Sequence, residues 1–155
     1  MAVQIVAQAF DPLELLRRHQ AGLGAPARRI GALASFVGSM RDMNEGAEVT
    51  AMTIEHYPGM TERHIEQLVA DTTARYSLDD CLVVHRVGRV EPGDTIVLVA
   101  TWAAHRAHAF ESCRAIMEAL KSSAPLWKKE DTRAGARWVA NNTPGEVTAF
   151  EADTP

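Results

Sequence analysis

The spacing of apolar residues divides the chain into segments of two periods, one typical of strands and the other of helices. Segments 3–10 (VQIVAQAF), 27–40 and 49–57 (VTAMTIEHY) are apolar or alternate with a period of two, which predicts β-strands. The last of them stops at Pro58-Gly59, a dipeptide that marks a turn. The polar segment 41–48 (RDMNEGAE) is expected to be a mobile loop.

Three other segments predict helices. Residues 12–20 (PLELLRRHQ) form a short one, because Pro12 suits the first turn of a helix. A second helix is expected from Thr61, which is a suitable N-cap. Its inner face at helical spacing comprises Ile65, Leu68, Val69, Thr72 and Tyr76. A third helix is expected from about His105, with a buried stripe of Phe110, Cys113, Ile116, Met117 and Leu120.

A β-hairpin is the strongest turn signal in the sequence. Segments 82–90 (LVVHRVGRV) and 95–103 (TIVLVATWA) are both strand-like, and Glu91-Pro-Gly-Asp94 between them is rich in turn residues. Past Pro125 the chain is expected to be extended again. Because strands and helices do not alternate strictly, the predicted fold class is α+β with mainly antiparallel strands.

Composition indicates one ordinary globular domain. The 155 residues are 46% apolar and 23% charged, with a net charge of −4. An acidic chain lacks the basic footprint of a nucleic-acid binder, so no nucleic-acid partner is expected. The apolar run 96–104 is far shorter than the roughly 20 residues of a membrane helix. No secretory signal is evident in the first ten residues, which indicates a cytoplasmic protein away from membranes.

The cysteines, histidines and glycines offer little catalytic chemistry. Cys81 and Cys113 are too few and too far apart for a disulfide framework, and both are expected to be reduced and inert. Histidines such as His105 and His108 lack a third clustered ligand, so no metal is predicted. The glycines match neither the dinucleotide fingerprint nor the Walker pattern, which disfavours nicotinamide enzymes and nucleotide hydrolases.

Cationic residues remain as the candidate chemistry. Arg41 follows a strand, His105-Arg106 begin a helix, and Lys121 lies at the far end of that helix. Lys128 and Lys129 lie just beyond Pro125. Each alone is more often a solvated surface charge than a ligand, and Lys121 also suits a helix C-terminus. If they converge, they form an anion-binding pocket in an acidic protein.

Five motifs resemble a known family, the large, catalytic subunits of molybdopterin synthase (MoaE). In chain order they are FVGSMRDMNEG (36–46), EHYPGM (55–60), HRVGRVEPGD (85–94), AHRAHAF (104–110) and LKSSAPLWKKE (120–130). The likeness extends from about residue 34 to 138, within a single domain, 1–155. The tail, 141–155, is outside it and is a candidate disordered segment.

The resemblance implies a fold, a reaction and an assembly. The family fold is an α/β hammerhead with an additional, mainly antiparallel sheet. The reaction is sulfur transfer to cyclic pyranopterin monophosphate (precursor Z), which forms the dithiolene of molybdopterin. Sulfur comes from a small ubiquitin-like subunit (MoaD type) whose Gly-Gly C-terminus is a thiocarboxylate, so no cofactor is required. Two large subunits form a homodimer within a heterotetramer.

The resemblance also assigns residues. Lys121 and Lys128 take the positions of two catalytic lysines. Arg41, His105 and Arg106 take those of substrate-binding residues, some of which the second copy of the dimer supplies. Arg137, in the segment RWV, is a weaker candidate for the same pocket.

Pro125 and Trp127 are expected to orient the lysine segment. Proline fixes the backbone direction after the helix, and the tryptophan is expected to be a packed anchor or, alternatively, to stack on the pterin ring. Two rival functions are a non-catalytic adaptor for a ubiquitin-like protein and a phosphate-ester hydrolase. An adaptor has no need of the arginines, and a hydrolase needs a metal cluster or a paired carboxylate base, which the sequence does not show.

Overall fold

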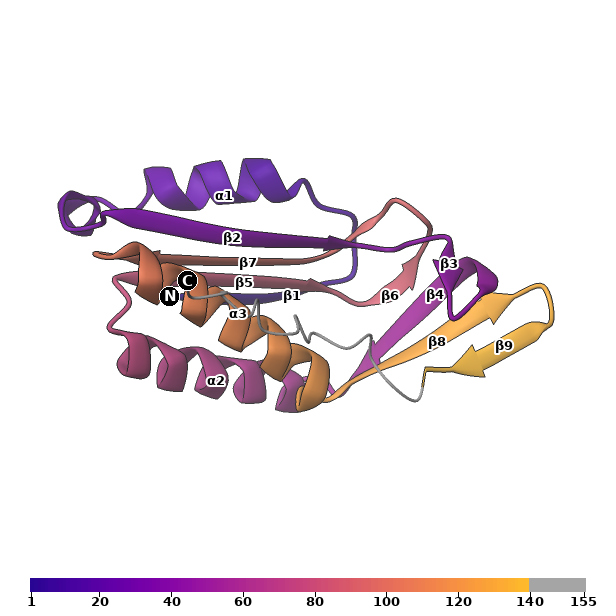
Figure 1. Ribbon diagram of the computed structural model, residues 1–155. Helices are drawn as coiled ribbons and strands as arrows, with labels where there is room; N and C mark the ends of the chain where they lie inside the picture. Colours follow the sequence, from indigo (N-terminus) through magenta and orange to yellow (C-terminus); the bar gives the residue numbers. More distant parts are fainter. Residues whose placement is uncertain (140–155) are drawn as a thin grey trace, which may run out of the picture.

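The computed structural model describes residues 1–139, so the predicted disordered tail lies outside the described residues. Figure 1 shows two sheets, a four-stranded one covered by helices on both faces and a five-stranded one projecting from one end. The predicted class is confirmed: helices and mainly antiparallel strands form an α+β fold.

The four-stranded sheet has the strand order β1-β5-β7-β2. Its strands are β1 (Ala2–Val6), β5 (Asp80–Arg86), β7 (Thr95–Ala103) and β2 (Ala32–Ser39). Only β1 and β5 pair in parallel; the other pairs are antiparallel. The central strands β5 and β7 are buried along nearly their whole length, because helices cover both faces of the sheet.

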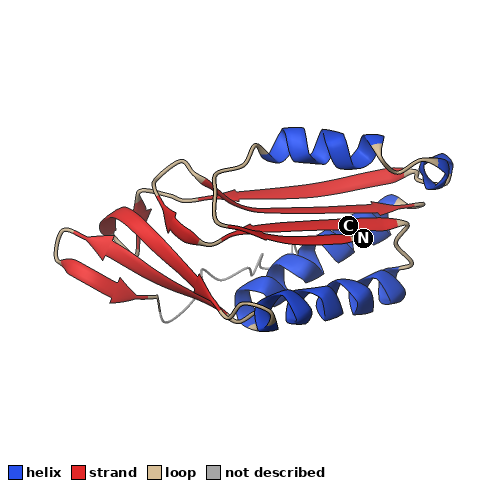
Figure 2. Ribbon diagram, turned by 180° about the vertical axis from the view of Figure 1, so that it is seen from behind, coloured by secondary structure: helices blue, strands red, loops and turns tan. Residues whose placement is uncertain are grey.

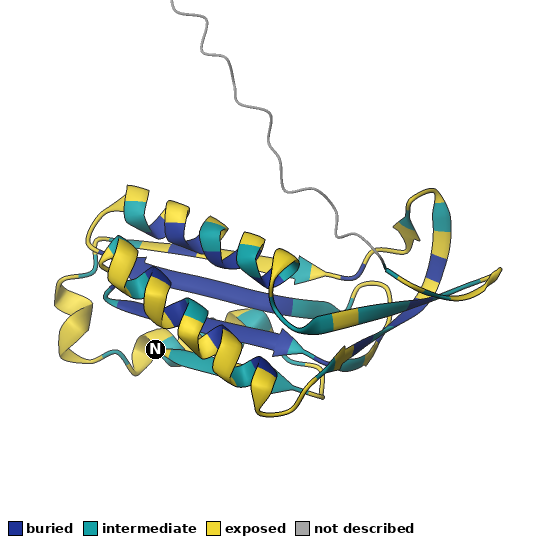
Figure 3. Ribbon diagram, turned by 90° about the horizontal axis from the view of Figure 1, so that it is seen from below, coloured by how far each residue is buried: buried dark blue, intermediate teal, exposed yellow. Residues whose placement is uncertain are grey.

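Three α-helices cover this sheet: α1 (Pro12–Ala21) on one face, and α2 (Met60–Tyr76) and α3 (Arg106–Ser122) on the other. A 3-10 turn (Ala25–Arg28) follows α1. The Asp11 side chain caps α1 by accepting from the backbone N–H groups of Leu13 and Glu14. In Figure 3 the inner sides of α2 and α3 are buried and their outer sides exposed, the pattern of amphipathic helices.

Two predictions about the helices are wrong. The N-cap of α2 is Gly59, whose N–H donates to the Glu62 carboxylate, whereas Thr61 is buried inside the first turn. There the Thr61 hydroxyl accepts from the Tyr57 N–H and donates to the Pro125 carbonyl, which ties α2 to the segment before β8.

Phe110 is the second correction, because it is exposed rather than buried. The inner face of α3 is centred on Ala109, Cys113 and Ile116. The Thr101 hydroxyl of β7 donates to the Ala109 carbonyl at 2.8 Å, which ties this face of α3 to the sheet. Phe110 is turned about 100° away from Ala109 around the helix and so faces outward.

The five-stranded sheet has the order β3-β4-β8-β9, with β6 also paired to β4. Its strands are β3 (Met43–Asn44), β4 (Ala47–His56), β6 (Gly88–Val90), β8 (Leu126–Thr132) and β9 (Gly135–Trp138). The expected mobile loop 41–48 therefore contains a tight hairpin between β3 and β4. Positive φ angles at Glu45 (50°) and Gly46 (77°) fit the turn that such two-residue hairpins need.

The predicted strand 82–90 is in fact two strands in two sheets. β5 ends at Arg86, the chain bends at Gly88 with φ 82°, and β6 pairs with β4 of the five-stranded sheet. Glycine is suited to this bend because it adopts a positive φ without steric cost. The bend joins the two sheets and leaves a space between them. Strand β2 and helix α3 end at this space, and strand β8 begins there.

Candidate active site

A cavity of about 290 Å³ lies between the two sheets. Its walls are largely apolar and include Phe36, Met40, Met43, Met52, Ile96, Val97, Met117, Leu120 and Leu126. Its polar side chains are Ser39, Arg41, Asn44, His85, Lys121, Lys128 and Glu130. A concave, mostly apolar site with a few convergent polar groups is typical of a small-molecule site.

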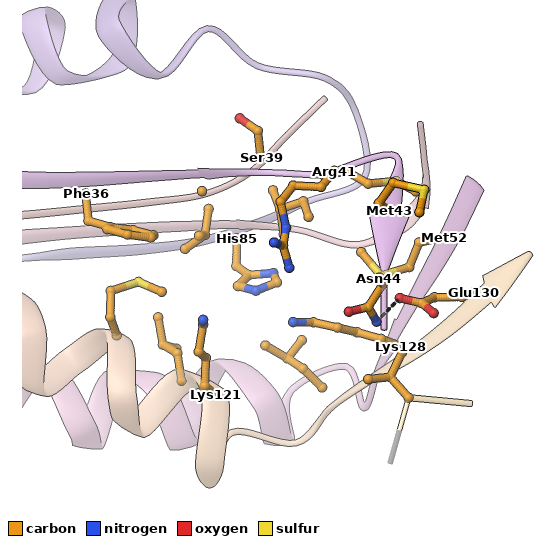
Figure 4. Close-up of a pocket in the computed structure, with 18 residues that line it drawn as sticks. Phe36, Ser39, Arg41, Met43, Asn44, Met52, His85, Lys121, Lys128 and Glu130 are labelled. Atoms are coloured by element: carbon orange, nitrogen blue, oxygen red, sulfur yellow. Dashed lines mark hydrogen bonds between the residues drawn. The ribbon is translucent and has the colours of Figure 1, made fainter. Parts of the chain in front are cut away.

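Two lysines from different elements face this cavity (Figure 4). Lys121 extends from the last turn of α3, and Lys128 from the first half of β8. Alternation along β8 places Leu126, Lys128 and Glu130 toward the cavity, since successive side chains of a strand point to opposite faces.

Trp127 lies on the other face of β8. It is 42% exposed, and its ring contacts Tyr57 edge-on with 5.0 Å between the centroids. The prediction that Trp127 is a packed anchor is therefore only partly confirmed, because its ring contacts an aromatic neighbour but remains exposed to solvent. Trp127 is also outside the set of described residues that line the cavity, where stacking on a ligand ring would take place.

The two ammonium groups influence each other. Burial lowers the pKa of Lys128, and the positive charge of Lys121 lowers it further, whereas the Glu130 carboxylate raises it. A lysine in such surroundings binds an anion strongly, because a negative ligand relieves both the desolvation and the repulsion.

Arg41 is the third cation of the cavity. It follows the end of β2, and in Figure 4 its guanidinium group points toward the His85 ring. Three cationic side chains, from the residues after β2 and from α3 and β8, thus line one cavity, as the anion-pocket hypothesis predicts. Lys121 and Lys128 are partly buried there, whereas Arg41 is exposed.

Arg137, another predicted pocket residue, holds the wall of the cavity together. Its guanidinium donates to the buried Glu130 carboxylate from Nε and Nη2, both at 3.1 Å, and to the Asn44 carbonyl at 3.2 Å. The Asn44 amide also donates to Glu130 at 2.7 Å. Arg137 lies outside the set of described residues that line the cavity, so within one chain it fastens the β3–β4 hairpin to β8.

His105 and Arg106 are not brought to this cavity within one chain. His105 is the N-cap of α3 and Arg106 its first residue, whereas Lys121 is in its last turn. At 1.5 Å per residue these ends are roughly 22 Å apart. The His105 ring instead contacts His108 edge-on, with 6.1 Å between the centroids.

Sequence reasoning missed His85 as a candidate. It is 5% exposed, lines the cavity, and has its Nδ1 2.8 Å from the Arg86 carbonyl. Burial lowers its pKa to about 4, and the positive charge of Lys128 adds to this effect. The available signal was the polar pair His85-Arg86 within the apolar run LVVHRV.

The cysteines are remote from this chemistry. Both thiols are free and buried outside the set of described cavity residues. Burial raises the pKa of Cys81 to about 12 and that of Cys113 to about 11. Both are therefore protonated at neutral pH and unreactive, as predicted.

Two further observations concern the described part of the chain. In residues 1–139, no three histidine, cysteine or acidic side chains gather as ligands of a metal ion would. No helix in the same range has the length and apolar character to cross a membrane.

Comparisons with known proteins identify the family. The family model described as "MoaE protein" matches residues 5–123. A protein of Ralstonia nicotianae named molybdopterin synthase catalytic subunit is 53% identical over 77% of this chain and 68% of its own length. One of the same name from Pseudomonas aeruginosa is 44% identical over 96% of this chain and 97% of its own.

Solved structures agree. The molybdopterin biosynthesis MoaE protein from Burkholderia ambifaria superposes with a TM-score of 0.74 at 48% identity, covering 94% of each chain. Molybdopterin synthase from Staphylococcus aureus superposes with a TM-score of 0.78 at 25% identity, covering 89% of this chain and 96% of that one. Because the family model matches residues 5–123 and a 44% identical relative covers 96% of the chain, this chain belongs to the MoaE family.

Proposed function

We propose that this chain is the catalytic subunit of a molybdopterin synthase. It transfers sulfur from the thiocarboxylated C-terminus of a small ubiquitin-like subunit to precursor Z and so forms the dithiolene of molybdopterin. The observation that carries this proposal is the convergence of Arg41, Lys121 and Lys128 on one apolar-walled cavity. The names of the close relatives support the same activity.

Electrostatics explains why such a reaction needs this cavity. The thiocarboxylate and the phosphate of precursor Z are both anions, and the reaction brings them together. At about 4 Å and an effective dielectric constant near 20, two unit charges repel by roughly 4 kcal/mol. Uncompensated, that repulsion slows a reaction about a thousandfold. Fixed cations in a water-poor cavity remove it and stabilise charge that develops in the transition state.

The three cations divide this task by their chemistry. An ammonium group is a compact point charge, so Lys121 is suited to neutralise the thiocarboxylate and the tetrahedral intermediate formed as sulfur leaves. Lys128, whose pKa is lowered by burial and by Lys121, is suited to substrate activation or proton transfer. The guanidinium of Arg41 is suited to hold the phosphate, because it can donate two parallel hydrogen bonds to two phosphate oxygens.

A second copy of the chain completes the pocket in this proposal. His105 and Arg106 lie at the opposite end of α3 from Lys121, so they serve this cavity only if a dimer partner brings them there. Two-fold symmetry makes such sharing natural, since each copy then supplies the same residues to the other. The assembly is a dimer of this chain with one small subunit for each cavity. Arg137 contributes indirectly, by holding Glu130 and the hairpin.

The free, buried thiols fit a cytoplasmic protein, where cysteines stay reduced. We therefore place the reaction in the cytoplasm.

Reconstitution tests the proposed function. The protein is mixed with the thiocarboxylated small subunit and precursor Z, and the dithiolene product is measured. We expect product in proportion to the thiocarboxylate supplied, and none when the small subunit ends in an ordinary carboxylate. Binding of the small subunit without product would identify an adaptor. Release of phosphate from precursor Z without the small subunit would identify a hydrolase.

A variant with Cys81→Ala and Cys113→Ala is expected to keep sulfur transfer within about twofold of the wild type, because protonated, buried thiols are not nucleophiles. Initial rates in the reconstituted reaction, alongside circular dichroism to verify folding, are the measurement. A well-folded double variant that binds the small subunit but transfers no sulfur would instead indicate a cysteine relay.

A further inference from the structure

We propose that His85 is the proton acceptor of this cavity, taking a proton from the water molecule that releases the small subunit's tail after sulfur has been transferred. The inference rests on the proposed function, because it concerns one step of that reaction. It assigns a catalytic part to a residue of β5 that lies between the three cations.

The hydrogen bond of His85 fixes its orientation. Its Nδ1 lies 2.8 Å from the Arg86 carbonyl oxygen, and because a carbonyl only accepts, Nδ1 carries the proton. In the neutral ring Nε2 therefore has a free lone pair. A base held in one tautomer by a backbone carbonyl is the arrangement found in general-base histidines.

The surroundings keep this lone pair available. Arg41, Lys121 and Lys128 are cations around the cavity. The carboxylate that lines it, Glu130, already accepts hydrogen bonds from Asn44 and Arg137. Burial and the charge of Lys128 lower the pKa of His85 to about 4, so the ring is neutral at pH 7. In its cationic form Lys128 can donate a proton but has no lone pair with which to accept one. His85 is thus the neutral nitrogen base among the described residues that line the cavity.

The reaction requires such a base. The tail arrives as a thiocarboxylate and, once its sulfur is bonded to the substrate, remains attached through an acyl–sulfur bond. Water attacks the acyl carbon, a carbon–oxygen bond forms, and the carbon–sulfur bond breaks. Sulfur leaves as a thiolate on the substrate, and one proton of the water moves to Nε2 of His85. The new carboxylic acid then loses its own proton to solvent.

The charge of the cavity changes in step with this reaction. Anionic ligands raise the pKa of a nearby imidazole, so the filled cavity makes His85 a better base than the empty one. When the anions leave, the imidazolium again lies among Arg41, Lys121 and Lys128, and repulsion from these cations returns the proton to solvent. The His85 ring is then neutral again before the next tail binds.

The test follows a single turnover with His85→Asn, mixing the variant with thiocarboxylated small subunit and precursor Z. An asparagine amide occupies nearly the position of Nδ1, so it keeps a donor for the Arg86 carbonyl but has no basic nitrogen. Intact-mass spectrometry then measures the covalent adduct between tail and substrate. We expect the adduct to form normally and its hydrolysis to slow by about 100-fold or more, the usual contribution of a general base. His64→Gln, an exposed histidine on α2, is the control and should hydrolyse the adduct at the wild-type rate.

A second variant guards against a purely structural effect. His85→Ala leaves space for added imidazole, which should restore hydrolysis of the adduct but leave adduct formation unchanged. Hydrolysis at the wild-type rate in His85→Asn would overturn the inference. So would equal losses of small-subunit binding, adduct formation and hydrolysis that imidazole does not restore. Absence of any adduct or product with the wild-type protein would contradict the proposed function instead.

Discussion

Lys121→Ala is expected to lower sulfur transfer by about a thousandfold while leaving the protein folded. The ammonium group lies at the cavity beside Lys128, where two anions must meet. Its loss restores roughly 4 kcal/mol of repulsion at close approach, which corresponds to about three powers of ten in rate. Folding should survive because Lys121 is only partly buried, in the last turn of α3.

The matched control for this variant is Lys129→Ala. Lys129 is a close sequence neighbour of the second pocket lysine, but its ammonium lies 5.8 Å from the centre of the Trp138 ring, on the other face of β8. We expect it to retain activity within a few-fold, since exposed cation–π contacts contribute only about 0.5–1 kcal/mol. Initial rates of dithiolene formation and thermal unfolding are measured for both variants. Equal losses in the two, or full activity in Lys121→Ala, would contradict the assignment of Lys121.

Sulfur-transfer activity is expected to return when two inactive variants are combined in one dimer. If a site combines Lys121 of one copy with Arg106 of the other, a heterodimer of Lys121→Ala and Arg106→Ala contains one site without either substitution. Random association of coexpressed chains makes about half of the dimers mixed, so about a quarter of all sites are intact. Activity should therefore rise from near zero to about a quarter of the wild-type value.

The control pairs Lys121→Ala with Lys128→Ala. Both lysines belong to the cavity of the same chain, so every site in the mixed dimer has lost one of them and no activity should return. Recovery is measured as dithiolene formation per dimer in the coexpressed mixture, and mixed dimers purified with a different tag on each chain should reach about half of the wild-type value. Recovery in the control pair, or none with Arg106→Ala, would show that the pocket is not shared as proposed.

Local sequence patterns predicted most of the secondary structure. The helices of residues 12–21, 60–76 and 106–122 and the main strands follow from the periods of apolar residues and from proline and glycine. These signals fail where a tertiary contact determines the local structure. Thr61 has the chemistry of an N-cap, yet its hydroxyl is used inside the fold, toward Pro125. The segment 82–90 has one apolar pattern but crosses two sheets at Gly88.

The sequence by itself determined the fold class, the family and the kinds of side chain that carry the chemistry. These properties depend on residue types and short spacings, which can be read directly from the sequence. Only the tertiary structure decided that Arg41, Lys121 and Lys128 share a cavity, that His85 lies among them, and that His105 and Arg106 do not. The physical reason is that long-range position depends on how sheets and helices pack, whereas a local pattern specifies only which face of its own element a side chain occupies.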